Sequence, residues 1–293
     1  MLVAIAGVTE ARAQQEGPAP SFVAPKVGSA SQGAVALVLS GGAARGYAHV
    51  GVIKVMEANG LRPDIVVGCS AGSIVGGLYA SGLTMAQLDH AIGSLDVSTF
   101  DDLAIPGVAF LDSPLGLFKG DGLHAFLDKA LKHSLIEQFP IRFAAVATDL
   151  ATGEVAIFNA GDAGMAMRAS SAVPGVIAPA KIAGKLYSDC QVSSPLPVLA
   201  ARRMGATKII AIDVIYPPQD AQLSSMVRVV FQSMTISTYR LKEFELAMAD
   251  VVIAPVLPRT SGQLGFADRS RIIEAGAAAA REALAPLRKA FRR

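Results

Sequence analysis

The sequence predicts a three-layer α/β fold, with a mostly parallel central sheet and helices on both faces. Residues 34–39 (AVALVL) form a continuous apolar run, which is typical of a strand that is buried on both faces. A glycine-rich turn and a helical pattern follow, and the same order of strand, turn and helix begins again at Ile65. Two successive units of this kind favour parallel strands that are connected by helices crossing over the sheet.

The composition excludes several classes of protein. Of the 293 residues, 52% are hydrophobic and 17% are charged, which is the opposite of a disordered chain. The net charge of +2 is too small to indicate a nucleic-acid partner. The four histidines and two cysteines occur in neither C-x-x-C nor H-x-x-x-H spacing, so we expect no metal site and no cofactor.

The N-terminal part of the chain differs in composition from the rest. Residues 1–8 are apolar, and residues 11–13 (ARA) have the small-x-small form of a signal-peptidase site. Residues 14–33 are rich in Gly, Pro, Ala and Ser. We therefore expect a signal remnant and flexible linker over 1–33 and one domain over 34–293. A periplasmic or secreted location is the first expectation, and a cytoplasmic protein peripheral to a membrane is the alternative.

The first helices are predicted from apolar spacing. Residues 48–59 have a helical pattern that stops at Gly60, residues 65–67 form the second strand, and residues 71–80 form the second helix. The stretch 65–88 contains no charge and is long enough to span a membrane. Its glycines and hydroxyl side chains favour the strand, turn and helix instead, so we expect no membrane span.

The later elements follow from the same patterns. Residues 100–120 lack periodicity and are predicted to be a surface excursion. The apolar stripe of Met226, Val230, Met234 and Leu241 is expected to lie in the core rather than in a lipid groove. The remaining predicted elements are a helix at 121–132, a hairpin of strands 143–148 and 155–158, a helix at 164–172, a strand at 208–214, a helix at 224–249 and a strand at 251–253.

The C-terminal segment 268–293 is basic, with seven Lys and Arg residues against three acidic ones. Its apolar residues, among them Ile272, Leu284 and Leu287, fit one stripe of a helix. The first interpretation is a terminal helix that packs on the domain and exposes its charged face. The second is a helix that is attracted to anionic lipid head groups.

A G-x-S-x-G motif lies between the second predicted strand and the second predicted helix. In this setting the motif predicts a nucleophile elbow, in which a sharp turn presents the Ser70 hydroxyl at the N-terminus of a helix. The alternative is a glycine-rich turn with an incidental serine. The motif consists of Gly68, Cys69, Ser70, Ala71 and Gly72.

A second glycine-rich turn follows the first strand, and three functions compete for it. A phosphate-binding P-loop is excluded because Tyr47 stands where the motif needs Lys, and a dinucleotide fingerprint is excluded because its second glycine is Ala43. The third function is an oxyanion hole beside Ser70, built from backbone N–H groups. The turn consists of Gly41, Gly42, Ala43, Ala44, Arg45 and Gly46.

The histidines leave no partner for a common hydrolase triad. Such triads run Ser, acid, His along the chain, but the last histidine is His133 and the final 160 residues contain none. The base for Ser70 is therefore predicted to be a carboxylate whose pKa is raised by burial. Spacing alone leaves five candidates open: Asp112, Asp121, Asp149, Asp189 and Asp213.

Four segments together resemble the bacterial patatin-like phospholipases, a family of lipid acyl hydrolases with a Ser–Asp dyad. They are SGGAARGYAHVGVIKVMEANGLRPDIVVGCSAGSIVGGLYASG, ATDLATGEVAIFNAG, RASSAVPGVIAPAK and YSDCQVSSPLPV, and the resemblance as a whole runs from about residue 35 to residue 214. The resemblance implies that Ser70 is the nucleophile and Asp189 its base. It also implies that the turn 41–46 forms the oxyanion hole, with Arg45 at the family's basic position, and that no metal is needed.

The sequence departs from the family pattern at two places. Ala43 replaces the third glycine of the oxyanion turn, and we expect little loss because its N–H remains available. Cys190 and Gln191 replace the small residues that follow the family's aspartate, and a side chain there costs on the order of 1 kcal/mol if the turn needs positive φ. Cys69 and Cys190 flank the two dyad residues, but side chains of an elbow point apart, so we expect no disulfide.

The predicted function is a serine lipid acyl hydrolase of the phospholipase A or lysophospholipase type, with a lipid or ester substrate and peripheral membrane contact. The alternatives are a general esterase or thioesterase, and a catalytically weak lipid-binding scaffold. We expect His49 to be a packed helix residue. The expected wall for the acyl chain consists of Leu103, Ile105, Val108, Phe110, Leu111, Leu115, Leu117 and Phe118.

Overall fold

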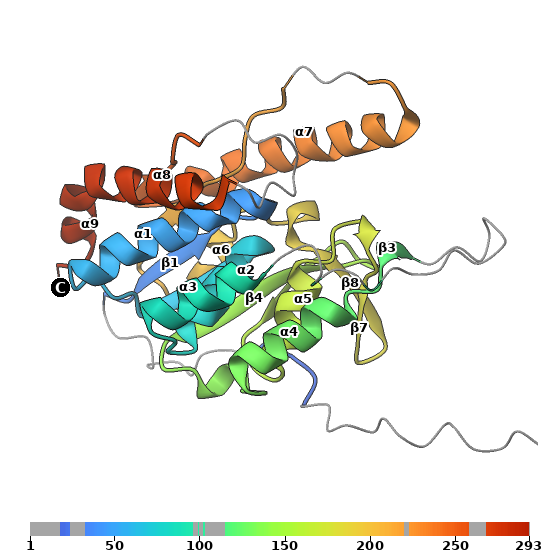
Figure 1. Ribbon diagram of the computed structural model, residues 1–293, viewed down its shortest axis with the longest axis horizontal. Coiled ribbons are helices and arrows are strands. Elements are labelled where there is room, and N and C mark those ends of the chain that lie inside the picture. The colour runs from blue at the N-terminus through green and yellow to red at the C-terminus, as the bar shows by residue number, and fades with distance from the viewer. Residues whose placement is uncertain are drawn as a thin grey trace, which may run out of the picture.

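The computed structural model describes residues 18–23, 33–95, 99, 102, 115–219, 223–257 and 268–292. An eight-stranded sheet in the order β10-β9-β1-β2-β4-β8-β7, with β5 paired to β4, crosses the molecule. Helices cover both faces of the sheet, which confirms the three-layer α/β prediction (Figure 1). The parallel strands are β1 (Val35–Leu39), β2 (Ile65–Cys69), β4 (Arg142–Asp149), β9 (Lys208–Ile212) and β10 (Val251–Ile253).

The sheet is mixed because three strands pair antiparallel with a neighbour, β5 and β8 with β4, and β7 with β8. They are β5 (Val155–Phe158), β7 (Ala180–Ile182) and β8 (Lys185–Asp189). The hairpin of β4 and β5 was predicted, whereas β7 and β8 were not, since their short sequence carries little apolar signal. Two further strands, β3 (Gly116–Phe118) and β6 (Gly175–Ile177), form a separate parallel pair.

The first strand shows why an uninterrupted apolar run was needed. Val35, Leu37 and Leu39 enter one hydrophobic core, while Ala36 and Val38 enter a second core on the opposite face. Successive side chains of a strand alternate between faces, so burial on both sides requires apolar residues at every position. The larger core receives α1 (Tyr47–Ala58), α2 (Ala71–Ala80), α3 (Met85–Ser94), α4 (Asp121–Leu131), α5 (Ala163–Ser170), α8 (Arg269–Glu282) and α9 (Leu284–Ala290), and the smaller core receives α6 (Val198–Arg203).

The uncharged stretch 65–88 forms β2, α2 and the start of α3, as expected. Within the described ranges, no helix is long and apolar enough to cross a membrane.

The basic C-terminal segment packs on the domain, in agreement with its first interpretation. Ile272 and Leu287 are fully buried. The segment forms two helices, α8 and α9, rather than one. Pro286 explains the break, because it has no N–H to donate to the carbonyl of Glu282 and its ring would crowd that turn.

The predicted long helix exists as α7 (Met226–Leu246), but its expected place in the core is wrong for its first half. The side chains of Met226 and Val230 are 79% and 52% exposed, whereas Met234 and Leu241 are half-buried. Figure 1 shows the physical reason, since the N-terminal half of α7 extends past the body of the domain.

Part of the predicted linker lies against the domain. Ser21 forms an antiparallel bridge with Ala160, and the Ser21 N–H donates to the Ala160 carbonyl over 2.8 Å. The side chain of Asn159 bonds both the N–H and the carbonyl of Val23. Apart from residues 18–23 and Gly33, residues 1–33 lie outside the described part of the chain.

Candidate active site

Ser70 occupies a sharp turn between β2 and α2. Its backbone has φ 51° and ψ −122°, a conformation that residues with a side chain rarely adopt. A Cβ at Gly68 would collide with the backbone of Gly72 and Ser73, so the turn closes only with glycine there. The geometry is that of the predicted nucleophile elbow, with the serine at the N-terminus of a helix.

The elbow is held by hydroxyl groups. The Ser70 N–H donates to Oγ of Ser170 over 2.9 Å, and the Ser73 hydroxyl donates to the Ser70 carbonyl over 2.7 Å. Ser170 comes from α5 and its role was missed in the sequence, although the RASS motif that contains it was noted. These bonds stabilise the strained backbone from both sides.

The glycine-rich turn packs directly against the elbow. Strands β1 and β2 are neighbours, with Leu39 opposite Gly68. A Cβ at Gly72 would lie 2.5 Å from the Leu39 carbonyl oxygen, and one at Gly46 would lie 2.6 Å from Cβ of Ala71. The structure therefore brings the two predicted turns together, and their glycines are required by this close approach.

Within the turn, Ala43–Gly46 forms one short 3-10 helix. Ala43 has φ 50°, so replacing the family's glycine places a side chain in a left-handed conformation at a cost of about 1 kcal/mol. The Gly41 N–H donates to the Pro195 carbonyl, and the Arg45 N–H to the Gly42 carbonyl. Among the described residues, the N–H groups of Gly42 and Ala43 have no hydrogen-bond partner.

The side chain of Arg45 lies against an aromatic ring. Its guanidinium lies over the ring of Tyr216, 4.9 Å from the centroid. Burial lowers the pKa of Arg45, and the nearby Asp213 opposes this effect.

Asp189 reaches the elbow because β4 aligns two distant segments. Cys69, at the end of β2, lies opposite Val146 of β4, and Asp189, at the end of β8, lies opposite Ala147. Strand β5 pairs with residues 145–148 of β4 and therefore occupies the edge opposite to both β2 and β8. Strands β2 and β8 thus lie one after the other along the same edge of β4. Val146 and Ala147 are neighbours, and the ends of the two strands therefore meet.

The carboxyl group of Asp189 is buried, with no exposed surface. Its Oδ1 accepts the Gln191 N–H over 2.8 Å, and its Oδ2 has no hydrogen-bond partner of normal geometry in the described chain. Burial raises the pKa of Asp189 to about 7, while the Gln191 N–H and the Ser70 hydroxyl oppose the rise. The Ser70 hydroxyl is thus close enough to act on this carboxyl group.

The other candidate carboxylates have different partners. Asp149 pairs with Lys185 over 2.9 Å, and Asp213 pairs with Lys242 over 2.5 Å. Asp121 begins α4, and Asp112 lies outside the described residues. The structure therefore brings only Asp189 of the four described candidates to the elbow.

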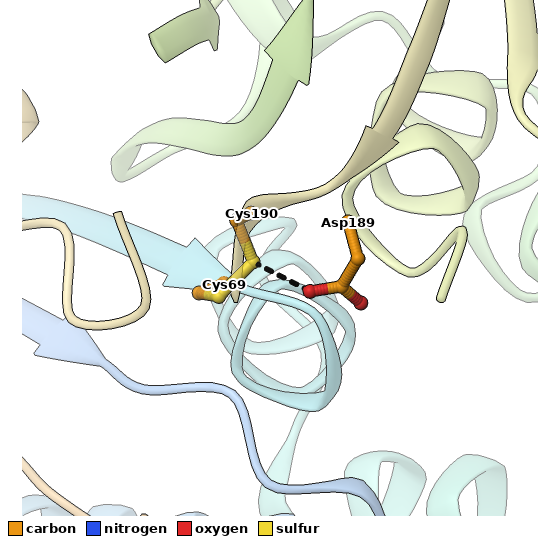
Figure 2. Close-up of side chains that lie close together, drawn as sticks. All are labelled: Cys69, Asp189 and Cys190. Atoms are coloured by element: carbon orange, nitrogen blue, oxygen red, sulfur yellow. Dashed lines mark hydrogen bonds between the residues drawn. A yellow bond between two sulfur atoms is a disulfide. The ribbon is translucent and has the colours of Figure 1, made fainter. Parts of the chain in front are cut away.

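The expectation of no disulfide is wrong. Cys69 and Cys190 are bonded to each other, with a Cα–Cα distance of 5.6 Å (Figure 2). The expectation considered the elbow alone, whereas the meeting of β2 and β8 brings Cys190 beside Cys69. These two sulfurs and Asp189 are close enough to form a metal-ligand set. Because both sulfurs are bonded to each other in the disulfide, neither cysteine offers a thiolate to bind a metal ion.

The residues that replace the family's small pair fit without the strain that was expected. Cys190 and Gln191 lie in a short 3-10 turn, and neither has a positive φ. The Gln191 side chain covers the glycine-rich turn, since a Cβ at Gly41 would lie 2.8 Å from its Nε2. Asp189 caps this turn with its own carboxyl group, which fixes the carboxyl direction.

His49 is a packed helix residue, as expected. It is fully buried, and its Nε2 lies 2.9 Å from the Ser40 carbonyl oxygen. Burial lowers the pKa of His49 to about 4, so the ring is neutral at pH 7. It ties α1 to the residue that follows β1.

A second cluster of ligand-type side chains occurs on α4 and the start of α5. His124 Nε2 lies 3.4 Å from a carboxylate oxygen of Asp128 and equally far from one of Asp162. All three are partly exposed and satisfy one another by charge, so we assign no ion to them.

The predicted acyl-chain wall is only partly described. Leu103, Ile105, Val108, Phe110 and Leu111 lie outside the described residues. Leu115 and Leu117 are 64% and 60% exposed, and Phe118 is half-buried in β3.

Comparisons with known proteins agree on one family. The family model described as patatin-like phospholipase matches residues 37–202. An uncharacterised NTE family protein of Mycobacterium tuberculosis is 36% identical over 195 residues, which are 67% of this chain and 52% of that protein. Lysophospholipase NTE1 of Scheffersomyces stipitis is 31% identical over 191 residues, covering 63% of this chain and 12% of that protein.

The chain thus spans about half the length of the mycobacterial relative. Among solved structures, VipD from Legionella pneumophila matches 96% of this chain and 72% of its own, with a TM-score of 0.54 at 13% identity, which is a likeness of fold alone. The family model covers more than half of the residues, including both candidate dyad residues. The chain belongs to the patatin-like phospholipase family.

Proposed function

We propose that this protein is a serine lipid acyl hydrolase of the phospholipase A or lysophospholipase type. Ser70 Oγ attacks the ester carbonyl while Asp189 accepts its proton, and an acyl-enzyme forms on Ser70. Water then releases the fatty acid, with Asp189 again as the base. Family membership supports hydrolysis of lipid esters, and the remaining detail rests on the geometry of the site.

One observation carries the proposal: the buried carboxyl group of Asp189 lies beside the strained turn of Ser70, where the ends of β8 and β2 meet. A carboxylate in water is too weak a base for a hydroxyl, but burial raises the pKa of Asp189 to about 7. Its Oδ2, which has no hydrogen-bond partner of normal geometry among the residues that the structure describes, is available for the Ser70 proton. Histidine is therefore not needed as the base.

The developing oxyanion requires N–H donors. The N–H groups of Gly42 and Ala43 are uncommitted within the described chain, and the first N–H groups of α2 add the positive end of a helix dipole. One such donor is worth about 3 kcal/mol in comparable acyl transfers. We assign the oxyanion hole to these groups rather than to the Gly41 or Arg45 N–H, which are already bonded.

Ser70→Ala tests the nucleophile. The variant should lose ester hydrolysis and labelling by a fluorophosphonate, whereas Ser81→Ala, at the far end of the same helix, should retain both. Labelling that persists in Ser70→Ala would refute the assignment.

A chain-length series separates the lipid hydrolase from the alternatives. Long-chain nitrophenyl esters and lysophospholipids should be cleaved faster than short esters. Equal rates on short and long chains would favour a general esterase or thioesterase. Lipid binding without turnover of any ester would favour a scaffold protein.

We also propose that α7 contacts the lipid surface that holds the substrate. Met226, Val227 and Val230 are 79%, 57% and 52% exposed. Arg228 is the sole charged residue between Leu223 and Ile236, so this half-helix presents apolar side chains and no acidic one. The double variant Val227→Asp/Val230→Asp should sediment less with phosphatidylcholine–phosphatidylglycerol vesicles, and unchanged sedimentation would overturn the assignment. Phe244→Asp, at the other end of α7, is the control.

We propose a periplasmic or secreted location. The Cys69–Cys190 disulfide supports it, because structural disulfides are typical of proteins in oxidising compartments. The protein isolated from its native cells should begin at Gln14 and should resist thiol alkylation. A full-length cytosolic protein with two free thiols would contradict this location.

A further inference from the structure

The disulfide joins the neighbours of both proposed catalytic residues. Cys69 immediately precedes Ser70, and Cys190 immediately follows Asp189. Both cysteines are fully buried. A crosslink at this place fixes the end of β2 to the end of β8, which are the two strand ends that carry the dyad.

The sulfur of Cys190 also touches the carboxyl group of Asp189. Sγ lies 3.3 Å from Oδ1 of Asp189 and 3.5 Å from the Ser170 carbonyl oxygen. Figure 2 marks the contact with Asp189 by a dashed line. A disulfide sulfur has no proton, so in the oxidised protein this contact donates nothing to the carboxyl group. A reduced Cys190 would have an S–H at the same place, and the charged, nearer Oδ1 is the better acceptor.

We propose that the redox state of the Cys69–Cys190 pair controls the dyad, and that the disulfide form is the more active one. In the disulfide form the crosslink positions Ser70 against Asp189, and among the described residues Oδ1 accepts a hydrogen bond from the Gln191 N–H alone. In the dithiol form the Cys190 S–H donates to Asp189 and stabilises its carboxylate, which makes it a weaker base. This inference rests on the proposed function, in which Asp189 is the base.

The electron balance is that of thiol–disulfide exchange. Oxidation converts two thiols, of Cys69 and Cys190, into one S–S bond and releases two electrons and two protons. An external protein or low-molecular-weight disulfide accepts them and becomes two thiols. Reduction by an external dithiol reverses each step.

Few other groups act on the Asp189 carboxyl. Its partners are the Ser70 hydroxyl from the elbow and the Gln191 N–H from the following turn. Ser170 from α5 accepts the Ser70 N–H, and Thr148 from β4 bonds the backbone carbonyl of Asp189 rather than its carboxyl group. Within the described chain, no ionised side chain contributes to its pKa. Reduction would create two nearby titratable groups, the thiols of Cys69 and Cys190. Of the two sulfurs, that of Cys190 has the recorded contact with the carboxyl group.

Two variants separate the crosslink from the S–H donor. Cys69→Ala removes the crosslink and keeps the Cys190 thiol, whereas Cys69→Ala/Cys190→Ala removes both. Each is compared with wild type in its oxidised form and after reduction by a phosphine, with circular dichroism as the check on folding. The readouts are kcat and the pH profile of kcat/KM on a soluble nitrophenyl ester.

We expect reduced wild type and Cys69→Ala to lose about three- to thirtyfold in kcat, and their acid limb to lie about half a pH unit or more below that of the oxidised protein. Cys69→Ala/Cys190→Ala should also lose kcat, but the acid limb of its pH profile should stay at the same pH as that of the oxidised wild type. An identical kcat and acid limb in oxidised and reduced wild type would overturn the proposal, as would two free thiols in the protein isolated under non-reducing conditions.

A second measurement does not depend on turnover. In Ser70→Ala, the infrared band of the protonated Asp189 carboxyl, identified by its absence in Ser70→Ala/Asp189→Asn, reports the pKa directly. The band should titrate at lower pH after reduction, and an unchanged midpoint overturns the S–H contact. If oxidised wild type hydrolyses no ester while the midpoint still moves, the proposed function fails and the redox contact stands.

Discussion

Replacing Asp189 by Asn should stabilise this protein at neutral and alkaline pH. The Asp189 carboxyl is buried without a counter-charge, and its pKa is raised from 3.8 to about 7. Between these two values the unfolded chain is ionised at Asp189 while the folded chain keeps the proton. The folded state therefore binds the extra proton, and its stability falls as pH rises through this window.

The size of the effect follows from the pKa shift. One pKa unit corresponds to about 1.4 kcal/mol, so the window from 3.8 to about 7 amounts to about 4 kcal/mol. Asn has nearly the same shape, keeps an oxygen for the Gln191 N–H and never ionises. The free energy of unfolding of Asp189→Asn should therefore match wild type near pH 4 and exceed it by about 4 kcal/mol above pH 7.

Urea unfolding followed by circular dichroism, at a series of pH values from 4 to 8.5, measures this difference. Asp149→Asn is the control, because Lys185 lowers the pKa of Asp149 and the stabilisation it gives is present at neutral pH and lost on acidification. That variant should be destabilised at pH 7. A stability gain in Asp189→Asn that does not depend on pH, or a loss at pH 8, would refute the assignment of a buried, uncompensated carboxyl at Asp189.

The same carboxyl group predicts that wild-type kcat/KM for ester hydrolysis, measured by stopped flow, rises with pH through about 7. Asp189→Asn should lose a hundredfold or more of kcat/KM. A kcat/KM that does not change with pH would contradict the role of Asp189 as the base. Ala43→Gly should gain about 0.5–1 kcal/mol in urea unfolding because it relieves a left-handed φ, and a loss would argue against that conformation. Gly72→Ala should lose about 1–3 kcal/mol and ester hydrolysis, because its Cβ would meet the Leu39 carbonyl; normal activity would contradict the close approach. Lys242→Met should lose about 3–5 kcal/mol by leaving Asp213 buried without its cation, and an unchanged midpoint would contradict that pair.

The sequence by itself determined the central part of the fold. The run at residues 34–39 predicts β1 because a strand with both faces buried must be apolar at every position. The motif at 68–72 predicts the elbow because only glycine permits the observed approach of α2 to β2. These are local requirements, and they are written in consecutive residues.

Spacing left five aspartates open as the base, and the family resemblance pointed to Asp189. The tertiary structure gives the physical reason for that choice. The selection depends on the register of β4, which places the end of β8 beside the end of β2. The disulfide follows from the same register and was not expected from the elbow alone. Strand register joins residues that are distant in the chain, and no local pattern encodes it.

The apolar pattern of α7 is a second case in which the sequence predicts an element but not its surroundings. Apolar spacing predicts a helix there, and the helix exists, but spacing does not tell whether another element covers its apolar stripe. Met226 and Val230 are exposed because α7 runs past the edge of the domain, where the described chain offers no packing partner for them. Local sequence determined which elements form, and the three-dimensional arrangement decided which of them meet, because burial and proximity depend on the whole chain.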